Sequence, residues 1–114
     1  MQVQVPARPE LVAAIEDLRA EIKNAIENPS MSISGVRKKI KTAQNACSNG
    51  WHIVNLETYR AVADVQLRWD HFVFYRKTAR RAESGITPQH IVAARENLEN
   101  DLDAMCATVL AVVR

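Results

Sequence analysis

The sequence predicts an all-α fold: an up-and-down bundle of three long helices and one shorter helix. Only three glycines and four prolines interrupt 114 residues, so the chain favours long uninterrupted elements. Apolar residues recur at intervals of three and four, as in amphipathic helices, and alternating β-branched runs are missing. A chain of this length fits one domain. We expect that domain to span residues 9–114, after a flexible N-terminal arm at 1–8.

The first helix is expected to begin near Pro9, a residue favoured in the first turn, with Glu10 beside the positive end of the helix dipole. One face of the helix is apolar and the opposite face is polar. The helix should end at Asn28, because the residue before Pro29 is disfavoured in helical geometry. The apolar positions are Leu11, Ile15, Leu18, Ile22, Ala25 and Ile26.

A shorter second helix is expected from about residue 35 to 47, capped by Ser32 or Ser34. Its apolar stripe is narrow, and Asn49 and Gly50 should end it. The stripe consists of Val36, Ile40, Ala43 and Cys47. Residues 51–54 are expected to form a connector.

The third helix is expected to run from an N-cap at Asn55 to about Glu83. It carries two apolar stripes, which predict packing against neighbours on two sides. The first stripe contains Val62, Val65, Trp69, Phe72 and Val73, and the second contains Leu56, Ala63, Leu67 and Phe74. The remaining arc, with Arg68, His71 and Tyr75, should face water.

The last helix is expected to begin at Thr87 and Pro88 and to continue to the end of the chain. Its apolar residues repeat every seven positions, which favours shallow-angle packing against another helix. Residues 104–113 lack charge, so their surplus apolar surface predicts either a buried core or a homodimer contact that would complete the bundle. The residues concerned are Leu98, Leu102, Met105, Val109, Leu110 and Val112.

Charge is distributed unevenly, although the formal net charge is only +2. Residues 31–54 contain four positive and no negative side chains, whereas both ends of the chain are acidic. Some cations near the end of the third helix are explained by the helix dipole. The functional interpretation joins two clusters, 37–41 and 76–81, into one patch for a phosphate backbone or an acidic protein. Its residues are Arg37, Lys38, Lys39, Lys41, Tyr75, Arg76, Lys77, Arg80 and Arg81.

Signals for catalysis or metal binding are sparse. The histidines occur singly, and no Cys-x-x-Cys or His-Glu-x-x-His spacing is present, so we expect no metal and no cofactor. A Cys47 and His52 pair could make a reactive thiolate, but Cys47 also completes an apolar stripe. Residues 42–60 satisfy a helix-turn-helix pattern only in part. We therefore expect no enzymatic activity.

The leading hypothesis is a small, non-enzymatic helical protein that acts as a regulator, adaptor or inhibitor by binding another macromolecule through its charge-segregated surface. The expected partner is another protein or a second copy of the chain. The alternative is a nucleic-acid-binding protein that uses clusters 37–41 and 76–81. Neither a leader peptide nor an apolar run near 18 residues is evident, so we expect a cytoplasmic protein without membrane contact. No small-molecule substrate is evident from the sequence.

Overall fold

The computed structural model describes residues 9–28, 33–49, 52–53, 55–81 and 85–113. These residues form four helices: α1 (Pro9–Glu27), α2 (Ile33–Ala46), α3 (Leu56–Thr78) and α4 (Pro88–Val113). Two short strands, β1 (Ser48–Asn49) and β2 (His52–Ile53), lie between α2 and α3. The expectation of an all-α fold is confirmed. The proposed N-terminal arm at 1–8 lies outside the described residues.

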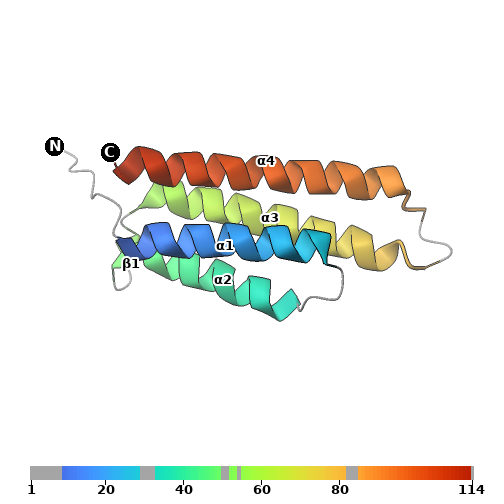
Figure 1. Ribbon diagram of the computed structural model, residues 1–114, viewed down its shortest axis with the longest axis horizontal. Coiled ribbons are helices and arrows are strands. Elements are labelled where there is room, and N and C mark those ends of the chain that lie inside the picture. The colour runs from blue at the N-terminus through green and yellow to red at the C-terminus, as the bar shows by residue number, and fades with distance from the viewer. Residues whose placement is uncertain (1–8, 29–32, 50–51, 54, 82–84, 114) are drawn as a thin grey trace.

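The four helices lie side by side along one axis, and successive helices run in opposite directions (Figure 1). Each packs against two others, in the ring α1, α2, α3, α4 and back to α1. The molecule is elongated, with extents of 56 × 23 × 22 Å. This ring gives every helix one inward face and one outward face, and the inward faces form a single core.

The core is built from the inward stripes of all four helices. Trp69 and Phe72 of α3 are its largest side chains, with ring centroids 6.0 Å apart. Burying a side chain such as Leu or Phe stabilises the fold by about 1.5 to 3 kcal/mol. The buried apolar residues include Leu11, Ile15, Leu18, Ile22, Val36, Ile40, Cys47, Val62, Val65, Leu98, Leu102, Met105 and Val109.

The helix starts and ends agree with the sequence for α1 and α4, but differ in part for α2 and α3. Ser34 lies inside α2, so it does not cap that helix, and Ser32 lies outside the described residues. The expected connector is a short antiparallel hairpin that pairs Ser48 with Ile53. Asn55 precedes α3 as predicted, yet its side chain makes no capping hydrogen bond. Its backbone N–H donates to the carbonyl of Cys47 at 3.1 Å, which ties the hairpin to α3.

Helix α3 is shorter than the sequence predicted. It ends at Thr78, and Arg80 and Arg81 continue as a turn whose backbone N–H groups donate to the carbonyls of Lys77 and Thr78. The last buried side chain of α3 is Phe72. Val73 and Tyr75 still pack partly against the core, but from Arg76 to Arg81 the chain has no large apolar side chain to bury, so local propensity no longer sustains the helix.

Helix α3 packs against neighbours on two sides, as predicted, but its second apolar stripe does not pack within the described chain. The first stripe faces the core, but Leu56, Ala63, Leu67 and Phe74 are exposed. Helices α2 and α4 instead approach the two flanks of the first stripe. There they meet polar side chains: Gln44 bonds Gln66, and Arg68 bonds Asp101.

Candidate functional site

The outward face of α2 is basic. Arg37, Lys38 and Lys41 are exposed there, and none of the three pairs with a carboxylate among the residues that the structure describes. Their spacing explains the shared face, because Lys41 lies four positions after Arg37 and three after Lys38, and residues three and four apart are neighbours on a helix surface. The helix itself contains no acidic residue that could neutralise them.

The end of α3 carries further cations, and it extends along the bundle axis beyond the start of α2 (Figure 1). The Nε2 atom of Gln44 lies 3.1 Å from Oε1 of Gln66, which holds α2 against one flank of α3. Helix α3 ends at Thr78, so Lys77, Arg80 and Arg81 lie beyond the start of α2 along the bundle axis (Figure 1). We call Arg37, Lys38, Lys41, Lys77, Arg80 and Arg81 the basic surface.

Arg76 does not belong to the basic surface. Its Nη1 and Nη2 atoms donate to the carbonyls of Ala25 (3.1 Å) and Ile26 (2.8 Å) at the end of α1. Its guanidinium also lies 4.8 Å from the ring centroid of Phe72. Burial, followed by the nearby charges of Arg80 and Arg95, lowers the pKa of this guanidinium. It remains positive at neutral pH and stabilises the negative end of the α1 dipole.

Two further predicted residues are also separated from the basic surface. Lys39 points toward α1, where its Nζ lies 3.6 Å from the carboxylate of Asp17. Tyr75 is half-buried on the α4 side of α3, where it stacks on His90 with ring centroids 6.1 Å apart. The expectation that Tyr75 faces water is therefore wrong. Six of the nine predicted cations and aromatics remain on the basic surface.

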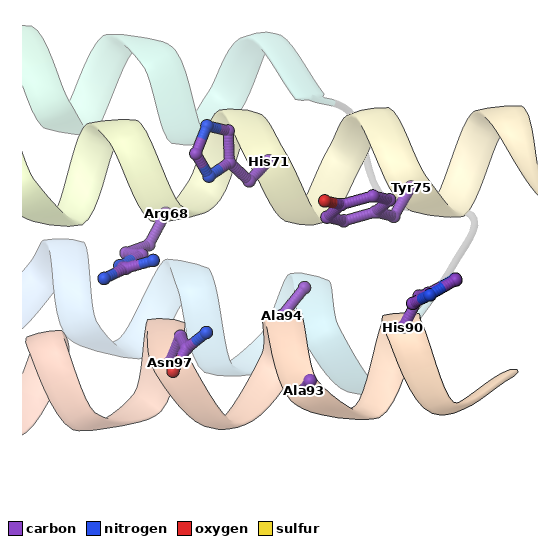
Figure 2. A pocket seen from close by; sticks show the side chains of 7 residues that line it. All are labelled: Arg68, His71, Tyr75, His90, Ala93, Ala94 and Asn97. Atoms are coloured by element: carbon purple, nitrogen blue, oxygen red, sulfur yellow. The ribbon is translucent and has the colours of Figure 1, made fainter. Parts of the chain in front are cut away.

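Tyr75 and His90 belong to a cleft of about 160 Å³ between α3 and α4. In Figure 2, Arg68 and Tyr75 reach from α3 toward α4, and Asn97 and His90 approach from α4. The cleft exists because α4 presents only the small side chains of Ala93 and Ala94 opposite the aromatic ring, as Figure 2 also shows.

The cleft has polar groups but little space. Ligand pockets usually measure about 300 to 1,000 Å³, so this cleft admits a small ion or a few waters. Nε of Arg68 donates to Oδ2 of Asp101 at 3.2 Å, which partly neutralises its charge. Nδ1 of His90 accepts from the backbone N–H of Thr87 at 3.0 Å, so it helps to begin α4. Both side chains thus have structural partners.

The residues predicted for an oligomer contact occupy the protomer core wherever their side chains are described. Leu98, Leu102, Met105 and Val109 are buried between α4 and its neighbours. These four side chains already have partners within one chain. The side chains of Leu110 and Val112 lie outside the described residues.

Both cysteines are free, and burial disfavours the thiolate form of each. Burial raises the pKa of Cys47 to about 11, so its thiol stays protonated at neutral pH. Burial also raises the pKa of Cys106, the largest of several effects there. The side chain of His52, considered above as a partner of Cys47, lies outside the described residues. Within the described ranges, no three His, Cys, Asp or Glu side chains are placed to hold a metal ion.

None of the described helices combines the length and apolar character needed to cross a membrane. Comparisons of the chain with models of protein families, with curated proteins and with solved structures found no match. Its function must therefore be inferred from its own residues.

The sequence contains one signal for the cleft. Arg68, His71 and Tyr75 are three and four positions apart, so they share one face of α3. Their meeting with His90 and Asn97 depends on the register of α3 against α4, which a single sequence does not reveal.

Proposed function

We propose that the protein is a non-enzymatic regulator, adaptor or inhibitor that binds an acidic macromolecule through the basic surface. The observation that carries this proposal is that its six cations, on the outward face of α2 and at the end of α3, have no ion-pair partner within the described residues. Elsewhere the charged side chains often pair: Asp17 with Lys39, Arg19 with Asp103, Arg68 with Asp101, and Arg95 with Glu99.

Free cations on one face favour a polyanionic partner, because their fields add instead of cancelling. The leading partner is a protein with an acidic surface. The second candidate is nucleic acid, and the observation in its favour is that unpaired cations stand both on the outward face of α2 and at the end of the adjacent α3, two segments far apart in the sequence. We further propose a cytoplasmic location, which the free cysteines favour, and a homodimer that completes the helical bundle.

Titration by fluorescence anisotropy tests the proposal and separates its two candidates. Labelled poly-glutamate peptide, duplex DNA and single-stranded RNA are each titrated with the protein at several salt concentrations. Each duplex phosphate contact steepens the log–log salt dependence by about 0.9, so six cations predict a slope no steeper than about −5 for DNA.

Tight binding of the peptide alone would support the acidic protein partner, and tight binding of DNA or RNA would support the second candidate. The proposal would be wrong if all three probes bound no better than about 100 μM near physiological salt, a value typical of nonspecific contact.

A further inference from the structure

The outward face of α3 carries an exposed apolar stripe. Leu56, Leu67 and Phe74 are 47%, 53% and 60% exposed, and Ala63 lies on the same line. On a helix of 3.6 residues per turn, these four positions fall within about 40° of one another, opposite the stripe that enters the core. Single exposed apolar residues are normal, but an aligned row over most of a helix favours a contact.

No described part of the chain covers this stripe. Helix α2 reaches one flank of α3, where Gln44 bonds Gln66. Helix α4 reaches the other flank, where Asp101 bonds Arg68. The stripe therefore runs between the two flanks on the free side of α3, and α1 lies across the core from it.

The stripe is symmetric about its own centre. Arg60 and Asp70 lie within about 40° of its midline, on opposite sides, and complete a seam with spacing 4, 3, 4, 3 and 4. Its six positions form three pairs: Leu56 with Phe74, Arg60 with Asp70, and Ala63 with Leu67. The two members of each pair lie equally far from residue 65 along the sequence.

We infer that a second copy of this chain covers the stripe, with the two α3 helices antiparallel across a twofold axis near Val65. A twofold contact places residue i of one copy against residue j of the other and repeats the contact in reverse. Here every such pair is complementary. Leu56 meets Phe74 of the partner copy, the small Ala63 receives Leu67, and Arg60 faces Asp70 across the seam.

The charges make the second copy a better occupant than an unrelated helix. Arg60 and Asp70 in one chain are ten residues apart, about 15 Å along the helix, so they do not pair within α3. In the antiparallel dimer they form two ion pairs at the edges of an apolar seam, and a parallel arrangement would instead place like charges together. The inference extends the homodimer within the proposed function and gives that dimer a surface.

The dimer also bears on the basic surface. The twofold axis runs across α3 from the α2 flank to the α4 flank, so it leaves both α2 helices on the same side of the dimer. Two basic surfaces would then face one partner together. The seam is a single helix pair, smaller than a standard interface, and we expect a dissociation constant of about 1 to 100 μM.

Sedimentation equilibrium of the intact chain, with circular dichroism to check folding, tests the inference. Leu67→Glu should weaken the dimer at least tenfold by placing a charge at the seam centre. Leu67 is exposed, so the monomer should keep its helical signal. Asn100→Glu, on the exposed outer face of α4, is the matched control and should leave the dimer unchanged.

A charge swap tests the register. Arg60→Asp and Asp70→Arg should each weaken the dimer about tenfold, because two like-charge pairs replace two ion pairs, and the double variant should recover to within about threefold. A chain that stays monomeric to about 0.5 mM, or a dimer insensitive to Leu67→Glu, would overturn the inference. A dimer whose double variant stays as weak as the single variants would overturn the antiparallel register. Sedimentation equilibrium measures the molar mass of the protein without any polyanion. A failure of the dimer proposal can therefore be distinguished from a failure of the polyanion-binding proposal.

Discussion

Replacing Arg76 by methionine tests whether this residue is part of the architecture. Methionine keeps an unbranched apolar stem over Phe72 but donates no hydrogen bond to Ala25 or Ile26. Hydrogen bonds from charged groups contribute about 1.5 to 3 kcal/mol when well buried. Arg76 is only partly buried, so we assign about 1 kcal/mol to each bond and expect a loss of about 2 kcal/mol in total. At roughly 2.1 cal/mol/K per residue of unfolding entropy, this lowers the Tm by about 8 °C.

The control is Lys77→Met, which removes the same charge from the next residue. The side chain of Lys77 is exposed and has no ion-pair partner among the described residues, so its replacement should change stability by no more than about 0.5 kcal/mol. Urea unfolding followed by far-ultraviolet circular dichroism measures both variants. Equal stability of the two would contradict the assignment of Arg76 to the end of α1 and would return it to the partner-binding residues.

Three further predictions concern Cys47 and two glycines. The pKa of Cys47 is raised from 9.0 to about 11, so the folded chain keeps a proton that the unfolded chain releases, and stability should fall between pH 9 and 11. Between these two pH values, the free energy of unfolding should fall by about 2 kcal/mol more for the wild-type chain than for Cys47→Ala. The same pH dependence in both chains would refute this prediction. Gly85 has φ of 70°, so Gly85→Ala should lower the free energy of unfolding by about 1 kcal/mol, as measured in urea. Gly35→Ala should raise that free energy by about 0.5 kcal/mol through helix propensity, because the new Cβ meets only Oε1 of the flexible Glu21 side chain, 2.8 Å away; a loss of stability would show that Glu21 is held in place.

The local features of the fold were predictable because each has a local cause. Pro9 and Pro29 bracket α1, Pro88 begins α4, and the inward stripes follow a helical period. The end of α3 was not predictable in the same way. Residues 79–83 contain nothing that forbids a helix, and the helix ends where its buried face ends, which depends on tertiary packing.

The site was harder to predict because it depends on pairing between distant segments. Arg76 and Lys77 are neighbours with the same charge, and only the approach of the α1 carbonyls separates their roles. The two stripes of α3 were visible in the sequence, but both are apolar and helical in period. Which of them enters the core is decided by where α2 and α4 pack. The two neighbours of α3 were therefore predictable, but the exposure of the second stripe was not.

The central claim, binding through the basic surface, is tested most directly by two variants of equal net charge. One carries Arg37→Gln, Lys38→Gln and Lys41→Gln on α2, and the other carries Ala13→Glu, Asn100→Glu and Ala107→Glu on the exposed outer faces of α1 and α4. Each lowers the formal net charge from +2 by the same three units. Anisotropy titration with the best-binding probe should show at least a tenfold weaker Kd for the α2 variant, and less than about a threefold change for the other. Equal weakening of both variants would show that overall charge, and not this surface, governs binding.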